Sequence, residues 1–346
     1  MAWYPEEKRT ILVAQPLVHA SVYTYDRFPL DGLGITKIRL IFCATVTAGT
    51  GTGVITMGVY NWLKGITLRN DRDEYYFKSV PGLALYKAGF YFDKATPHYD
   101  PIIAAAAGQA YMAVVDLPLV YPFLNRSEDT IVETKRLNNL TLEIATGNPI
   151  DFFGVPGTAT VVITMGIEVI GTRASVGVTK DGTPDPLRAQ AYFHSYMRTY
   201  PLIHADVQTF WDLEAAPDLA LLGFLLFNHG ASGIPFLGAT AGFAGLDNPT
   251  AVSLYDIGHR YLNNILVQSF QHERNLHPSF NDQGFRHSAD VTSPFTRIGE
   301  YPHSFVKNGS INEGYATKLI PRLEWTNATA TDEADLLVWG VRKLRG

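Results

Sequence analysis

The chain has 346 residues, of which 46% are hydrophobic and 12% aromatic, and this composition excludes an intrinsically disordered protein. Its 30 Gly and 20 Pro residues favour many short strands joined by turns, so all-β is the expected fold class, and the length suggests two domains. The net charge of −5 argues against direct binding of nucleic acid, while the low charged content of 18% favours surfaces that are buried in an assembly.

Three further features argue against a secreted protein, a protein that depends on its cysteine and a membrane-spanning protein. Residues 1–7 lack the basic start and apolar core of a signal peptide, so we expect synthesis in the cytoplasm. Cys43 lies in an apolar alternating run, and we expect it to be a small core residue rather than a nucleophile or a disulfide partner. Gly, Pro and Asn interrupt residues 219–246, which favours a strand followed by a turn over a membrane-spanning helix.

The first half of the chain shows the period-two alternation that is typical of β-strands. Ile38, Leu40 and Phe42, for example, alternate with Lys37 and Arg39, which predicts one core-facing side for this strand. Strands are predicted at residues 35–47, 59–69, 74–80, 111–120, 137–145 and 159–171, with a short helix at residues 81–93.

A cluster of Gly, Pro and Asp at residues 177–186 predicts an exposed connection, which we interpret as a domain boundary near residues 172–190. The expected domains are residues 1–178, including an N-terminal arm, and residues 179–346. The second half repeats the order of the first, because the apolar spacing of residues 62–68 returns at residues 261–267. Its predicted strands span residues 219–227, 261–270, 319–325 and 335–344.

Several patterns that suggest catalysis or metal binding are better explained otherwise. His272 and His277 are five residues apart, so they would not share one face of a helix as zinc ligands do. The Gly- and Thr-rich residues 49–53 resemble a phosphate loop, but we expect a strand rather than a helix after them. The carboxylate pair Asp71 and Asp73 suits a turn. We therefore expect no enzyme activity and no catalytic, metal-binding or cofactor-binding residue.

The Thr- and Gly-rich end of a strand at residues 45–53, followed by residues 60–70 (YNWLKGITLRN), resembles the opening strands of double jelly-roll major capsid proteins. These proteins form the shells of tailless icosahedral viruses of bacteria and archaea and the hexons of adenovirus. The resemblance implies two consecutive eight-stranded jelly-roll sandwiches and a homotrimeric, pseudo-hexagonal capsomer in the virion. It also implies contacts with neighbouring capsomers and with other capsid or vertex proteins, and it permits an internal viral membrane as a partner.

Long connections with little periodicity, such as residues 271–317, are expected to hold subunit contacts, because aromatic residues often anchor interfaces. The candidate contact residues are Tyr91, Phe92, His98, Tyr99, Phe280, Phe285, Phe295 and Tyr301. Exposed aromatic rings also stack on sugars, so a carbohydrate-binding β-sandwich of a viral tail or receptor-binding protein remains an alternative, followed by an all-β glycoside hydrolase. Residues 1–10 are expected to be a disordered or sheet-pairing arm rather than a lipid contact.

Overall fold

The computed structural model describes residues 6–47, 49, 58–92, 110–121, 123–125, 130–153, 157–173, 189, 191–201, 208–214, 218–230, 251–256, 259–266, 300–306, 308–316, 322–326 and 332–343. Strands dominate these residues, and the helices among them are short, which confirms the all-β prediction. The chain divides into two compact units, one formed by residues 1–196 with 341–346 and the other by residues 197–340.

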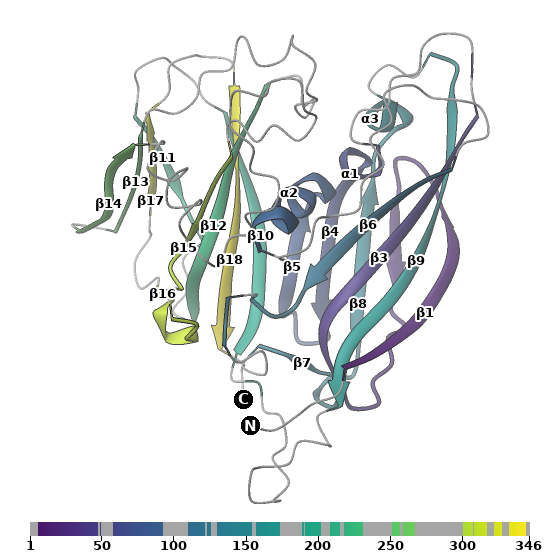
Figure 1. Cartoon of the computed structure of the whole chain (residues 1–346), viewed down its shortest axis with the longest axis horizontal. Coiled ribbons are helices and arrows are strands. Elements are labelled where there is room, and N and C mark those ends of the chain that lie inside the picture. Colours follow the sequence, from purple (N-terminus) through teal and green to yellow (C-terminus); the bar gives the residue numbers. More distant parts are fainter. Residues whose placement is uncertain are drawn as a thin grey trace, which may run out of the picture. The chain divides into compact units, whose positions relative to one another are not determined.

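The first unit contains an antiparallel sheet with the strand order β1-β9-β3-β6, and the short strand β7 also pairs with β3. Figure 1 shows these long strands running side by side. In strands β3, β6 and β9, every second side chain is buried, because successive side chains of a β-strand point to opposite faces of the sheet. The strands are β1 (Glu6–Leu17), β3 (Leu33–Thr47), β6 (Ala110–Pro118), β7 (Val132–Glu133) and β9 (Thr160–Arg173).

A second sheet of the first unit has the order β10-β5-β4-β8-β2. Its strands β4 and β8 contribute fully buried aliphatic side chains, including Ile66, Leu68 and Ile144, so the inner faces of both sheets supply the core. The strands are β2 (Val22–Tyr25), β4 (Leu63–Asn70), β5 (Tyr75–Val80), β8 (Leu140–Thr146) and β10 (Ala191–Pro201).

The first unit also contains short helical segments: α1 (Val59–Trp62), α2 (Gly82–Phe92), α3 (Pro149–Phe153) and the 3-10 turn η2 (Thr134–Arg136). The predicted strand at residues 59–69 is therefore wrong for its first four residues, which form one helical turn before β4. The reason is packing, since Trp62 has no exposed surface and its Nε1 donates a hydrogen bond of 2.9 Å to Nδ1 of His19. Tertiary contacts of this kind outweigh the local preference of a mixed apolar segment.

The second unit contains two further sets of paired strands. In one, β12 lies between β15 and β18 and also pairs with β16; in the other, the order is β11-β17-β13-β14. The elements are β11 (Gln208–Asp212), β12 (Leu219–Gly230), β13 (Ala251–Asp256), β14 (His259–Leu266), β15 (Glu300–Ser304), η4 (Ile311–Glu313), β16 (Tyr315–Ala316), β17 (Arg322–Thr326) and β18 (Asp332–Lys343).

Cys43 corrects one sequence expectation. It is exposed rather than buried in the core. From Ile38 onward the even-numbered positions of β3, including Phe42 and Ala44, face the core, so the alternation turns Cys43 outward. The apolar residues around Cys43 in the sequence therefore did not show which face of the sheet Cys43 occupies.

The predicted domain boundary remains a prediction, because residues 174–188 lie outside the described residues. Within the described part, β9 pairs with β1 and β3, both from the first unit. None of the described helices is long and apolar enough to span a membrane.

Candidate assembly surface

The side of the β1-β9-β3-β6 sheet that points away from the core carries side chains arranged in register across four strands, and we call it the outer face. Arg39 of β3 lies opposite Asp116 of β6 on one side and opposite Glu168 of β9 on the other. Glu168 in turn lies opposite Thr10 of β1. Because cross-strand neighbours on one face lie about 5 Å apart, these residues form one continuous row.

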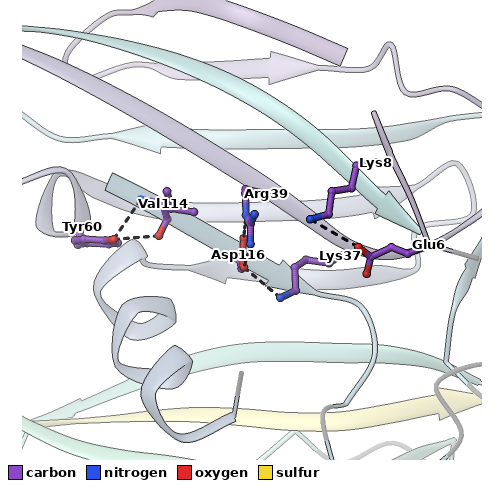
Figure 2. A network of polar contacts seen from close by, with 7 residues as sticks. All are labelled: Glu6, Lys8, Lys37, Arg39, Tyr60, Val114 and Asp116. Carbon is purple, nitrogen blue, oxygen red and sulfur yellow. Dashed lines mark hydrogen bonds and ion pairs between the residues drawn. The ribbon is translucent and has the colours of Figure 1, made fainter. Parts of the chain in front are cut away.

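Arg39 and Lys37 hold the carboxylate of Asp116 from two sides. Arg39 Nε donates a hydrogen bond of 2.8 Å to Oδ1, and Nη2 donates one of 2.9 Å to Oδ2. Lys37 Nζ donates a third bond of 3.2 Å to Oδ2 (Figure 2). The paired Arg–carboxylate geometry is strong and directional, so it fixes the position of three charged side chains on β3 and β6.

A second ion pair lies on β1, where Lys8 Nζ is 3.7 Å from Glu6 Oε1 (Figure 2). Both side chains are more than half exposed, so this pair contributes little to stability. We call the six charged residues of this half of the outer face the charged rows: Glu6, Lys8, Lys37, Arg39, Asp116 and Glu168.

The pKa of Asp116 lies below its ordinary value of 3.8. Burial alone would raise the pKa of this carboxyl, since it disfavours the charged form. The hydrogen bonds from Arg39 and the positive charges of Lys37 and Arg39 outweigh that effect. The ionised carboxylate is therefore stabilised in the folded protein relative to the unfolded chain.

We expect the Asp116→Asn substitution to lower the free energy of unfolding at pH 7 by about 1–3 kcal/mol, because it leaves two partly buried cations without their carboxylate. A folded pKa below the unfolded one means that this contribution is complete above the ordinary pKa of 3.8 and is lost as the pH falls through the lower folded value. Urea unfolding of both proteins between pH 7 and pH 2 measures the difference.

The difference between wild type and Asp116→Asn should shrink only at the acidic end of that range. As a control, Glu143→Gln breaks the ion pair with Arg69 on the other sheet, where both side chains are about one-third exposed, and should cost less. An Asp116→Asn effect that is absent at pH 7 would show that the three-residue cluster does not stabilise the sheet.

The other half of the outer face carries no charged residue at its outward positions on β3, β6 and β9. Val162 is 62% exposed and Met112 is 44% exposed. Cys43 is also exposed and lies in register with Met112 and Thr164, while Thr45 lies opposite Val162. We call these five residues the uncharged rows: Cys43, Thr45, Met112, Val162 and Thr164.

Among the described strands β6 lies at the edge of this sheet, and a side chain caps that edge. The hydroxyl of Tyr60 in α1 donates a hydrogen bond of 3.0 Å to the carbonyl of Val114 and accepts one of 3.3 Å from its N–H (Figure 2). Tyr60 itself has no exposed surface. Since unpaired edge groups are a template for adding a strand, this cap limits edge pairing near Val114.

The structure tests none of the candidate contact residues from the sequence. Tyr91 and Phe92 end α2, and Tyr301 belongs to β15. The other five lie outside the described residues: His98, Tyr99, Phe280, Phe285 and Phe295. Their role in subunit contacts stays a prediction.

Sequence reasoning missed the outer face as a candidate surface because it looked for contacts in loops. The alternation of Lys37 and Arg39 with apolar residues was visible, but Asp116 lies 77 positions from Arg39 along the chain, and only strand register brings the two together. Among the described residues, no group of three or more His, Cys, Asp or Glu side chains could hold a metal ion.

Comparisons with known proteins identify the fold through structure rather than sequence. No protein-family model and no curated protein matches the sequence. The solved major capsid protein of Sulfolobus Turreted Icosahedral Virus is similar with a TM-score of 0.69 and 14% identity, over 97% of this chain and 96% of that chain.

Two further capsid structures are similar over nearly their whole length. The PBCV-1 virus capsid gives a TM-score of 0.60 at 10% identity, over 99% of this chain and 94% of that chain. The major capsid protein P2 of bacteriophage PM2 gives 0.58 at 10% identity, over 99% and 98%. The chain therefore has the fold of viral major capsid proteins. More particularly, this fold is the double jelly roll, which confirms the resemblance inferred from the sequence as one of fold.

Proposed function

We propose that the chain is a viral major capsid protein, a structural subunit that builds an icosahedral shell and has no enzymatic role. The observation that carries this proposal is the similarity to capsid subunits over nearly the full length of both chains. The protein would accordingly be located in the virion.

We further propose that three copies form a pseudo-hexagonal capsomer, which then contacts neighbouring capsomers and other capsid or vertex proteins. The low charged content of 18% supports extensive burial between subunits. The exposed apolar side chains on the outer face also support burial between subunits, since such surfaces usually mark interaction sites. An internal viral membrane beneath the shell is a further proposed partner.

The mass of the purified protein in solution tests this proposal. Size-exclusion chromatography with light scattering should give a particle of about three times the monomer mass of 38.2 kDa, or a larger assembly. A persistent monomer at micromolar concentration would contradict the capsomer. Specific binding on a glycan array, or turnover of glycosidase substrates, would favour a carbohydrate-binding protein or a glycoside hydrolase instead.

A further inference from the structure

His19 lies in the turn between β1 and β2, where the chain passes from one sheet of the first unit to the other. The last pair in the register of β1 with β9 is Leu17 with Ile163. Two residues further along each strand, Nε2 of His19 lies 3.0 Å from the carbonyl oxygen of Val161. The imidazole thus takes the place of a backbone donor at the end of this ladder.

The partners of the two ring nitrogens fix the state of the imidazole. Nδ1 of His19 accepts a hydrogen bond of 2.9 Å from Nε1 of Trp62 in α1. An indole N–H can only donate, so Nδ1 carries no proton in this arrangement. A carbonyl oxygen can only accept, so Nε2 carries the proton and donates it to Val161. The arrangement therefore requires the neutral imidazole in a single tautomer.

Backbone hydrogen bonds close the same turn against the end of β8. The N–H of Ala20 donates a bond of 3.0 Å to the carbonyl of Gly147, and the N–H of Gly147 donates one of 2.7 Å to the carbonyl of Trp62. The turn is strained, since Ala20 has a positive φ of 49°. A strained turn persists only where contacts from outside hold it, and the two bonds of the imidazole are such contacts.

Protonation of the imidazole would break this arrangement. It would place a hydrogen on Nδ1 facing the N–H of Trp62, so two donors would point at each other. Trp62 has no exposed surface, so its indole N–H has no solvent to turn to and would be left without an acceptor. A buried donor without an acceptor destabilises the closed form, so the protonated ring favours an open turn.

The other titratable groups on the elements around the turn do not compete with His19. The charged ones form ion pairs with each other: Asp151 of α3 with Lys64 of β4 at 2.6 Å, and Glu143 of β8 with Arg69 of β4 at 3.1 Å. The tyrosines of β2 and α1 are phenols, which ordinarily stay neutral between pH 5 and 8: Tyr23, Tyr25 and Tyr60. Residues 12–17 of β1 and 157–163 around Val161 contain no titratable side chain. Among the described residues around this turn, His19 is therefore the one whose charge ordinarily changes in that range.

We propose that His19 is a pH-sensitive latch of the first unit, closed by the neutral imidazole and opened when the ring takes up a proton. The latch holds the turn above the pH range in which imidazoles are protonated, and its contribution is lost as the pH falls through that range. Opening would loosen the link between the two sheets and uncover Trp62. The inference concerns the single subunit and goes beyond the proposed function, since it does not depend on assembly.

Hydrogen–deuterium exchange of the full chain tests the latch through the peptides that contain Ala20 and Gly147. After correction for the intrinsic pH dependence of exchange, we expect their protection to fall about tenfold from pH 8 to pH 5, while peptides of β6 keep theirs. His19→Gln keeps a donor and an acceptor but does not titrate, so its protection should be the same at both pH values. Trp62→Phe removes the indole donor, so the protonated ring meets no second donor and the pH dependence should shrink.

Each outcome decides for or against the latch. A wild-type profile without pH dependence would overturn it, as would equal loss of protection in β6, which would mean that the whole sheet loosens. A wild-type pH dependence that persists in His19→Gln would also overturn it. If His19→Gln does not fold, Trp62→Phe decides by the same measurement, and if neither folds, the wild-type difference between the turn and β6 decides alone. A monomeric protein with the expected profile would support the latch and contradict the capsomer.

Discussion

The Ile163→Asp variant is expected to fail to form a stable subunit. Ile163 is 1% exposed in β9, where it lies opposite Leu17 of β1 and Ala44 of β3. The substitution removes aliphatic contacts from a packed core and buries a carboxylate among apolar neighbours. We expect a loss of about 4–5 kcal/mol or more, which is comparable with the total stability of many domains. Soluble yield and urea unfolding measure the effect.

The adjacent residue provides a matched control for this substitution. Val162→Asp makes the same chemical change one position away, on the opposite side of the same strand, where the side chain is largely exposed. This variant should unfold within about 0.5 kcal/mol of the wild type, as surface substitutions usually do. Equal destabilisation by the two substitutions would show that the inner and outer faces of β9 are wrongly assigned.

The Gly171→Ala variant should be the second most damaging change, although it adds a single methyl group. The new Cβ would lie 2.2 Å from the carbonyl oxygen of Gly34 and 3.1 Å from Cα of Ile35. Both are backbone atoms of the adjacent strand β3, so no side chain can rotate to make room. We expect a loss of about 2–3 kcal/mol, typical of overpacking in a rigid environment, visible in the midpoint of chemical unfolding.

Gly166→Ala is the control for this prediction, because it makes the same change five positions earlier in the same strand. Its Cβ meets ordinary contact distances, so the free energy of unfolding should stay constant or rise by up to about 1 kcal/mol. If Gly171→Ala is as stable as Gly166→Ala, the close approach between β9 and β3 at Gly34 does not exist in solution.

Strands with a regular alternation could be predicted from the sequence, and those without it could not. The predicted strands at residues 35–47, 111–120 and 159–171 correspond closely to β3, β6 and β9. β1 was predicted only in part, as a disordered or sheet-pairing arm over residues 1–10. Its register shifts between Thr10 and Leu12 and again before Gln15, and such bulges break the period of two. Ala14 also has a positive φ of 52°, which a propensity argument does not anticipate for alanine.

The candidate surface was harder to predict than the fold, for a physical reason. Alternation shows which residues share one side of a strand, but the partner strand and its register decide which side chains meet across the sheet. The cluster of Lys37, Arg39 and Asp116 depends on the pairing of β3 with β6 and so could not be derived from either strand alone.

Electron microscopy of the purified oligomer tests most directly whether this chain is a capsid building block. We expect particles with threefold symmetry and a nearly hexagonal outline in top view, because three subunits with two related jelly rolls each would surround the axis. Single subunits, or oligomers whose symmetry is twofold only, would contradict the proposed capsomer.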